Sequence, residues 1–576
     1  MASLAGRVVS YVHRNGFWYT GRRGLEKLHD RLAKPYDKLW HQLEPKKDEL
    51  EKQKKDQTVQ AAGLISVVIP VYNTKPVLLD ALADSLMNQS YQNWEACLYD
   101  GASTSAETKA ALDALAKRDA RFHVLHGEIN EGISGNSNLA AEMAQGEWIA
   151  LCDHDDLLTA DALYYVAKTI VEQQPDMIFS DEDKVDETGT RFYEPNYKPD
   201  FCPDDLRSGN YICHLTVLRK TLLQKVGGFR KDFDGSQDHD LMLRCAEATD
   251  KIVHIPRVLY HWRTVGASMS HQHIDKCLDA AKRAVEEHME RTGLKGHVTI
   301  ERGFLRLHYD TKREQTIELI VIDNGDPKTW PDFVDRTKGW HTHPVHRMVI
   351  SPWKESAKAL DCDWIPWTDG GSVYPCINQA VAQSTADVIV VLHASVMMER
   401  DDHWLDEMLM YAQRDDVGAV TPLLVDRGGY TMHAGFAVDM ENLVSSCGIN
   451  KLAIAGGWHN MLGIVHNVAA VSSACFMIRR DHFIPFDENY QGGLGTVDWS
   501  LKLAKQGLWH VYTPFAKGKA DDKQCANWLL LHKAPDEADA ARYRAAWGDH
   551  VHDLSYSVNF ARQKANYALP KYKKEG

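Results

Sequence analysis

Residues 148–156 have the sequence WIALCDHDD, in which a short apolar run is followed at once by a cluster of carboxylates. An apolar run of this length that ends in polar residues is typical of a buried strand. Similar runs occupy Ile65–Pro70, Trp94–Tyr99, Phe122–Leu125 and Met177–Phe179. Segments of helical length separate them: Pro76–Asn88, Ala106–Arg118, Asn136–Gln145 and Ala160–Gln173. This alternation predicts an α/β fold with a mostly parallel central sheet.

Polar residues recur just past the carboxyl ends of these strands. They are residues 71–74 (VYNT), 100–103 (DGAS), 130–132 (NEG) and 153–156 (DHDD). In an open α/β sheet, ligands bind outside the carboxyl ends of the strands. Four such clusters at one predicted sheet edge are harder to explain as loops alone, so they predict a binding site there.

The cluster at residues 153–156 contains three carboxylates, Asp153, Asp155 and Asp156. Carboxylates crowded at one strand end repel one another unless a cation or hydrogen-bond donors compensate. Oxygen ligands favour hard ions such as Mg²⁺ or Mn²⁺. The alternative is a helix N-cap, because acidic residues suit a helix start and Leu157-Leu158 follows. One Asp is enough for a cap, so the pattern favours a metal.

Three later segments are less distinctive. Residues 180–184 (SDEDK) follow an apolar strand and are either a face toward the substrate or a solvated loop. Asp238 lies near the start of a predicted helix, where it or Asp240 could be an N-cap. His261 lies in a strand-like stretch and is one of 28 histidines, so alone it indicates little.

In combination, these segments resemble a family 2 glycosyltransferase of the A-type fold over about residues 60–295. The motifs that carry the resemblance occur in the family's order: residues 67–73 (VVIPVYN), 100–103 (DGAS), 130–136 (NEGISGN), 153–156 (DHDD), 237–238 (QD) and 260–263 (YHWR). Each motif alone is weak, but the ordered set is specific. It resembles bacterial enzymes that build O-antigens and other cell-surface polysaccharides, including rhamnosyltransferases.

The resemblance implies roles for individual residues. Donor-binding roles fall on Pro70, Tyr72, Asn73, Asp100, Asn136 and Asp153. Asp155 and His261 would be the metal ligands, with Mn²⁺ or Mg²⁺ as the ion. Asp238 would be the catalytic base, although Gln237 replaces the Glu that often precedes it.

The implied reaction is an inverting, metal-dependent transfer from a nucleotide-diphosphate sugar. The acceptor hydroxyl attacks the anomeric carbon while Asp238 accepts its proton, and the nucleoside diphosphate leaves from the opposite face. The metal would offset negative charge on the leaving group. The implied acceptor is a growing cell-surface glycan, free or lipid-linked.

The second half of the chain repeats the first. Trp148–Asp155 aligns with Val388–Ser395 at an offset of 240, and Arg219 and Asp238 align with Arg479 and Asp498 at an offset of 260. Constant offsets of this kind indicate a repeated fold. We therefore predict two tandem Rossmann-like domains of the A-type glycosyltransferase fold, at residues 61–300 and 310–545, between an N-terminal helical extension at 1–60 and a C-terminal tail at 546–576.

The chemistry is not repeated. Asp153 and Asp155 correspond to His393 and Ser395, and the region expected to match His261 reads Phe515-Ala516-Lys517-Gly518. Only the base-like Asp498 remains, where it could serve as a cap. This predicts an inactive second domain. The alternatives are a bifunctional transferase whose second site needs no metal, and a glycan-binding scaffold in which both halves are pseudoenzymes.

Composition limits the possible partners and cellular compartment of the protein. The net charge of −14 argues against nucleic acid as a partner. The 11 Cys residues include no CxxC pair, which predicts free thiols in a reducing cytosol. No apolar run approaches the ~18 residues of a membrane span, and no signal peptide is recognisable. Residues 1–40 are basic with interleaved aromatics, which predicts either a peripheral anchor on the inner face of the membrane or a helical extension packed on the protein itself. The sequence is compatible with a homo-oligomer.

Overall fold

The computed structural model describes residues 36–264, 274–312, 314–323, 330–338, 340, 343–368, 371–521, 523–530 and 535–571. The described chain divides into two compact units. The N-terminal unit is built from residues 36–201 and 209–305, and the C-terminal unit from residues 202–208 and 306–570. The short segment 202–208, which contains helix α9 (Pro203–Ser208), therefore belongs to the unit formed by the second half of the chain.

The sheet of the N-terminal unit begins as the sequence predicts. β1 (Ile65–Val71), β2 (Trp94–Asp100), β3 (Phe122–His126) and β4 (Trp148–Leu151) are parallel, in the order β3-β2-β1-β4. Every residue of β1 and β2 is buried, as expected for strands covered on both faces. Their polar carboxyl ends therefore meet at one edge of the sheet.

The sheet then continues with strands that reverse direction. β8 (Thr216–Arg219) pairs antiparallel with β4 and with β6 (Met177–Val185). β9 (Ile252–Arg263) pairs parallel with β6, and β5 (Leu157–Leu158) and β7 (Phe192–Asn196) attach antiparallel to β9 and β6. The long strands β6 and β9 thereby reach the edge at which β4 ends.

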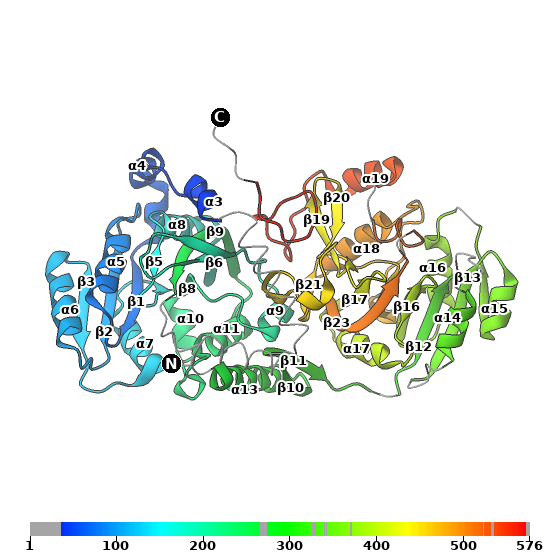
Figure 1. The fold of residues 1–576 in the computed structure, drawn as a ribbon, viewed down its shortest axis with the longest axis horizontal. Coiled ribbons are helices and arrows are strands. Elements are labelled where there is room, and N and C mark those ends of the chain that lie inside the picture. Colours follow the sequence, from blue (N-terminus) through cyan, green and yellow to red (C-terminus); the bar gives the residue numbers. More distant parts are fainter. Residues whose placement is uncertain are drawn as a thin grey trace. The chain divides into compact units, whose positions relative to one another are not determined.

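The predicted helices are present. They are α5 (Pro76–Met87), α6 (Ala106–Arg118), α7 (Gly132–Met143) and α8 (Ala162–Gln173). In Figure 1 the first three, in blue and cyan, lie alongside β1, β2 and β3. Leu79, Leu82 and Leu86 recur at helical spacing on α5 and are buried against the sheet, which accounts for the packing of this layer. Further helices are α10 (Lys220–Lys225), α11 (Gln237–Ala248) and α13 (Ile274–Thr292).

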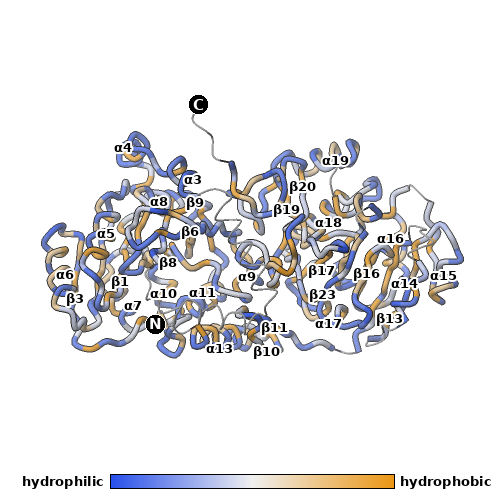
Figure 2. Tube along the Cα trace, in the orientation of Figure 1, coloured by the Kyte–Doolittle hydropathy of each residue, from blue (hydrophilic) through white to orange (hydrophobic). Residues whose placement is uncertain are grey.

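The described end of the N-terminal extension packs on its own unit. α3 (Tyr36–Leu43) buries Tyr36, Leu39 and Trp40, and the Tyr36 hydroxyl donates to Asp183 Oδ2 at 2.8 Å. α4 (Lys47–Lys55) is hydrophilic along its length, as Figure 2 shows. For residues 36–60 the predicted helices are present. Most of the basic segment 1–40, including the aromatic cluster Tyr11–Tyr19, lies outside the described residues, so the choice between a membrane anchor and a packed extension stays a prediction.

The C-terminal unit has the same strand order. Its main sheet runs β14 (Asp363–Pro366), β13 (Val345–Ser351), β12 (Ile317–Ile322), β15 (Val388–His393), β22 (Cys475–Arg479), β17 (Val417–Val425), β23 (Trp509–Ala520), β16 (Val396–Met398). Each position matches one strand of β3-β2-β1-β4-β8-β6-β9-β5 in the N-terminal unit, including the direction of pairing. The prediction of two tandem domains of one fold is confirmed.

The register supports the alignment of the two halves. Trp148 pairs with Arg219 in one sheet, and Val388 pairs with Arg479 in the other. In the same way, Leu157 pairs with His261, and its counterpart Met397 pairs with Lys519. Lys519 therefore occupies the position of His261, which corrects the expectation that residues 515–518 do.

Two further predictions concern cysteines and membranes. All eleven cysteines are free thiols, as predicted. Among the described residues, no helix combines the length and apolar character needed to cross a membrane.

Candidate active site

The loops after β1 and β2 are tied together at the sheet edge. The backbone N–H of Asn73 donates to Ser103 Oγ at 2.8 Å, and Asn73 Oδ1 accepts from the N–H groups of Thr104 and Ser105 at 2.8 and 3.0 Å. Asp100 is buried at the end of β2 and accepts from the N–H of Ser103 at 2.9 Å. Asn73 and Asp100 thus join the first two loops at one edge of the sheet, and their role in donor binding stays a prediction.

The third loop joins this edge through Asn136. The side chain of Asn136, on α7, donates to Asn130 Oδ1 at 3.0 Å and accepts from the N–H of Glu131 at 3.2 Å. A Cβ atom on Gly101 would lie 2.2 Å from Asn136 Nδ2. Gly101 is therefore needed for the close approach of α7 to the loop after β2.

Pro70 and Tyr72 border the same edge. Pro70 is paired with Tyr99 in the β1–β2 ladder, and Tyr72 is 43% exposed. An exposed aromatic ring beside a built polar edge is a surface on which a planar base can stack.

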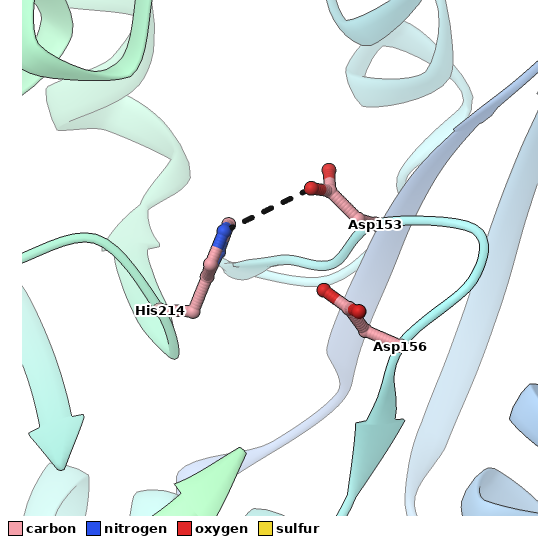
Figure 3. Close-up of side chains that lie close together, drawn as sticks. All are labelled: Asp153, Asp156 and His214. Atoms are coloured by element: carbon pink, nitrogen blue, oxygen red, sulfur yellow. Dashed lines mark ion pairs between the residues drawn. The ribbon is translucent and has the colours of Figure 1, made fainter. Parts of the chain in front are cut away.

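At the end of β4, three side chains face one another across the edge. Atoms of Asp153, Asp156 and His214 that could ligate a metal all lie within 4.8 Å of one another, with His214 Nε2 3.8 Å from Asp153 Oδ2 (Figure 3). Among the described residues this is the group of His, Cys, Asp and Glu side chains with metal-ligand spacing. None of residues 153–156 caps a helix, because β5 follows them and α8 begins only at Ala162, so the N-cap alternative is wrong.

Asp156 is fixed from two sides. The Tyr260 hydroxyl donates to Asp156 Oδ2 at 2.6 Å, and the N–H of Arg263 donates to Oδ1 at 2.7 Å. The Arg263 guanidinium also donates to the backbone carbonyl of Asp155 at 2.6 Å, and the N–H of Asp153 donates to Tyr260 Oη at 3.1 Å. The end of β9 thus sets the conformation of the whole carboxylate loop.

The charges in this cluster perturb one another. Burial raises the pKa of Asp155, and burial together with the neighbouring Asp153 and Asp155 carboxylates raises the pKa of Asp156 well above its usual range. Burial lowers the pKa of His214, but the surrounding carboxylates, with Asp153 the strongest, raise it overall. Concentrated negative charge of this kind favours the binding of a cation.

Asp238 lies in the same neighbourhood. Its carboxylate is among those that raise the pKa of His214, and its Oδ2 accepts from Asn210 Nδ2 at 2.8 Å. Asp238 is the second residue of α11, whose N-cap position is Ser236, so neither Asp238 nor Asp240 is an N-cap. Asp240 instead binds Arg230 and Arg244, which anchors the start of the helix.

The contacts described for His261, the second predicted metal ligand, are with residues other than Asp155. His261 is buried, and its Nδ1 lies 2.5 Å from Asp183 Oδ1, with its ring against Trp40 and Phe192 at 4.8 and 4.6 Å between centroids. Among the described residues no hydrogen bond or ion pair joins it to Asp155. The assignment of His261 as a metal ligand stays a prediction of the resemblance.

The acidic run at residues 181–183 is neither a solvated loop nor an open face. It lies in β6, and all three carboxylates are buried. Asp181 accepts from the N–H of Lys198 and lies 3.0 Å from His254 Nε2, and Asp183 binds Tyr36 and His261. Glu182 accepts from the N–H of His214 at 3.0 Å, so it holds the backbone of a residue in the cluster.

Sequence reasoning missed His214. It lies in the loop before β8, 61 positions from Asp153, and no motif around it marks it as a ligand. The signal is three-dimensional, since β8 is inserted next to β4 and its preceding loop is thereby brought to the end of that strand.

At the corresponding strand end of the C-terminal unit, the side chains are buried and contact one another. His393 Nδ1 lies 2.6 Å from Ser395 Oγ, which lies 2.8 Å from Cys525 Sγ, and all three residues are buried. Asp498 lies inside α18 (Leu494–Ala504), so it is not a cap. Trp547 Nε1 donates to its Oδ1 at 2.9 Å, and Lys502 Nζ lies 2.7 Å from its Oδ2.

The comparison with protein families gives a match that covers most of the sheet of the N-terminal unit. Residues 66–227 match the model described as "Glycosyl transferase family 2". The N-terminal unit contains a family 2 glycosyltransferase domain. The resemblance drawn from the motifs is confirmed.

Curated relatives carry related names. An uncharacterised protein, y4gI, from Sinorhizobium fredii is 33% identical over 80% of this chain and 53% of its own length. The O-antigen biosynthesis protein RfbC from Myxococcus xanthus is 31% identical over 78% of this chain and 36% of its own length. This chain therefore spans about half or less of these two relatives.

A solved structure is also similar. TarS residues 1–349 from S. aureus in complex with UDP is 19% identical, with a TM-score of 0.33 over 39% of this chain and 65% of that chain.

Proposed function

We propose that this protein is an inverting, metal-dependent glycosyltransferase whose N-terminal unit transfers a sugar from a nucleotide-diphosphate sugar to a growing cell-surface glycan. The observation that carries the proposal is the convergence of Asp153, Asp156, His214 and Asp238 at the carboxyl edge of a family 2 domain. Names of relatives, such as O-antigen biosynthesis protein RfbC, support the choice of a bacterial surface polysaccharide as product.

The donor binds along the edge formed by the first three loops. Tyr72 offers an exposed ring for the base, and Pro70 borders it. The loops fixed by Asn73, Asp100 and Asn136 hold the nucleoside, with Asp153 at the end next to the diphosphate. The bonds within these loops make the edge rigid before the donor arrives, which lowers the entropy lost on binding.

A divalent cation fits the cluster at the end of β4. On an octahedral Mg²⁺ or Mn²⁺ with ligands at about 2.1 Å, neighbouring ligand atoms lie about 3 Å apart and opposite ones about 4.2 Å. The 3.8 Å between Asp153 and His214 lies within that range. We propose that Asp155, Asp153 and His214 hold the ion, with His261 as the alternative to His214. When bound, the ion offsets negative charge on the leaving diphosphate.

Asp238 acts as the base. Asn210 Nδ2 donates to Asp238 Oδ2 and so orients the carboxylate. The acceptor hydroxyl gives up its proton to this carboxylate as its oxygen forms the bond to the anomeric carbon. The bond from that carbon to the diphosphate breaks on the opposite side, which inverts the anomeric configuration.

The C-terminal unit, proposed to span residues 310–545, does not turn over donor. Its counterparts of Asp155 and His261 are Ser395 and Lys519, and an ammonium group cannot ligate a metal. Its Asp498 is paired with Trp547 and Lys502, so it is not available as a base. These contacts disfavour a bifunctional enzyme and leave docking of acceptor, partner or a second copy as its role.

The proposal is tested by release of nucleoside diphosphate from a donor panel, comparing Asp238→Asn with its structural counterpart Asp498→Asn. Asp238→Asn is expected to lower turnover by 10²-fold or more, because general-base catalysis contributes 10²- to 10⁴-fold. Asp498→Asn should leave turnover unchanged. Loss of turnover in Asp498→Asn alone would place the active site in the C-terminal unit, and no turnover with any donor, together with retained glycan binding, would favour the scaffold.

A further inference from the structure

A buried lysine lies behind the site. The Lys198 side chain is 1% exposed, and its ammonium group donates to three backbone carbonyls: Ser180 at 2.7 Å, Ile212 at 2.5 Å and His214 at 2.5 Å. These three contacts are the shortest of the four hydrogen bonds that the ammonium group donates. Two of the three carbonyls belong to the loop that carries His214, so Lys198 fixes the path of that loop.

Glu182 holds the same loop from the other side. Its Oε2 accepts from the N–H of His214 at 3.0 Å and lies 3.4 Å from Lys198 Nζ, while its Oε1 accepts from Asn196 Nδ2 at 3.1 Å. Both polar backbone groups of His214 are therefore bound by charged side chains, the N–H by Glu182 and the C=O by Lys198. Charge-assisted hydrogen bonds of this kind are about twice as strong as neutral ones.

The His214 ring has no such support of its own. Its Nδ1 is buried without a hydrogen-bond partner, and its described contacts are the stacked Tyr260 ring at 4.7 Å between centroids, the edge of Trp262 at 6.4 Å and Asp153 at 3.8 Å. A metal-binding histidine usually donates its second ring N–H to an acceptor that fixes its orientation. Here that orientation has to come from the backbone and from the stacking on Tyr260.

We propose that Lys198 and Glu182 form a positioning clamp, which holds the backbone of His214 so that its Nε2 faces Asp153. The clamp touches neither donor nor acceptor, and it acts on the metal site only through His214. This inference rests on the proposed metal site at Asp153 and His214. It assigns a role to buried charges at the centre of β6 and in the segment after β7.

The test is a double-mutant cycle in which Mn²⁺ affinity is measured by calorimetry on the full chain in the presence of nucleoside diphosphate. Removing only Lys198 would leave Glu182 buried and unpaired, which endangers folding. The clamp is therefore removed as the pair Lys198→Met with Glu182→Gln, so that neither charge is left without the other. His214→Gln is made alone and together with this pair, and thermal unfolding confirms that each variant is folded.

The clamp predicts that the paired variant binds Mn²⁺ tenfold or more weakly, in the range found for groups that orient metal ligands. Adding His214→Gln to the pair should then change affinity no further, because both act through one side chain. Lys184→Met is the matched control. Lys184 lies on the same strand as Glu182 but pairs with Glu194 at the surface, so its substitution should not change Mn²⁺ affinity.

Three results would overturn the inference in distinguishable ways. If His214→Gln weakens Mn²⁺ binding but the paired variant does not, the metal site stands and the clamp is wrong. If the effects of His214→Gln and the pair add, Lys198 and Glu182 act on something other than His214. If His214→Gln itself has no effect on Mn²⁺ affinity, the proposed metal site fails, and the clamp with it.

Discussion

At the scale of single residues, the site depends on which histidine faces the carboxylates. Family resemblance favours His261, whereas geometry favours His214. The His261 ring is packed among Trp40, Phe192 and Asp183, which is the environment of a satisfied core residue. The His214 ring faces Asp153 and has one nitrogen without a partner.

A pair of substitutions separates these two assignments. His214→Gln is expected to weaken Mn²⁺ binding by tenfold or more, while His261→Gln should leave it within about twofold. His261→Gln should instead lower the free energy of unfolding by about 1–3 kcal/mol, because the buried Asp183 loses a hydrogen-bond partner. Mn²⁺ titration and urea unfolding measure the two effects. A tenfold loss of Mn²⁺ affinity in His261→Gln would restore the assignment made from the resemblance.

Carboxylates show the limit of sequence reasoning at this scale. Asp153, Asp155 and Asp156 stand out because they are adjacent in sequence at a strand end. Residues 181–183 also hold three carboxylates after an apolar run, yet they are buried. Their partners include Lys198, His254, Tyr36 and His261. Those partners lie 17 to 147 positions away, so no local pattern could have shown that the run is buried.

At the scale of secondary-structure elements, the parallel strands β1 to β4 and parts of β6 and β9 were predictable, whereas the short antiparallel strands β7 and β8 were not. Apolar runs of four to seven residues mark β1 to β4, and the helices between them follow from ordinary periodicity. β7 (burial mixed along its length) and β8 are short and depend on pairing with β6. Because β8 carries the His214 loop to the edge, missing it meant missing that residue.

The contact between the loop after β2 and α7 gives a prediction for this scale. Gly101→Ala would put a methyl group 2.2 Å from Asn136 Nδ2, so α7 or the Asn136 side chain must shift. We expect a cost of about 1–3 kcal/mol in unfolding free energy and weaker nucleotide binding, since Asn136 orders the third loop.

The matched control is Gly209→Ala, where an added Cβ meets no atom within 4 Å. It should change neither property, as measured by urea unfolding and by nucleotide titration. Equal effects of the two substitutions would show that the close approach at Gly101 is not what orders the edge.

At the scale of the whole molecule, the two units keep one strand order but differ in how they hold histidine. The C-terminal unit buries His393, His433, His466 and His510, and burial lowers their pKa values to about 4, 3, 4 and 4. In the N-terminal unit, carboxylates raise the pKa values of His126 and His254: at His126 the Asp100 hydrogen bond is the largest cause, and at His254 burial opposes the rise.

These opposite shifts predict unequal acid stability. A histidine whose folded pKa lies below its unfolded value of about 6.5 contributes stability above that value and loses it as the pH falls toward 4. Each such histidine changes the unfolding free energy by up to about 1.4 kcal/mol per pH unit in this window. His126 and His254 act in the opposite sense, since their contribution is present below about 6.5.

As the pH falls, the amide hydrogens of the C-terminal unit should therefore lose their protection from exchange before those of the N-terminal unit. Hydrogen exchange followed by mass spectrometry at pH 7.5, 6 and 5, corrected for the intrinsic exchange rate, resolves the two units by peptide. His466→Asn should reduce the difference in acid sensitivity between the two units, whereas substitution of the exposed His41 should leave that difference unchanged. Earlier loss of protection in β1 to β4 than in β12 and β15 would contradict the expectation.

The central claim is that one unit binds donor through a metal at the carboxylate edge. The most direct measurement is calorimetric titration of a nucleotide-sugar panel with Mn²⁺ into the wild type, Asp155→Ala and the counterpart Ser395→Ala. We predict a metal-dependent heat with one nucleotide that is lost in Asp155→Ala and kept in Ser395→Ala. Metal-dependent binding that survives Asp155→Ala would contradict the site assignment, and loss of binding in Ser395→Ala alone would move the donor site to the C-terminal unit.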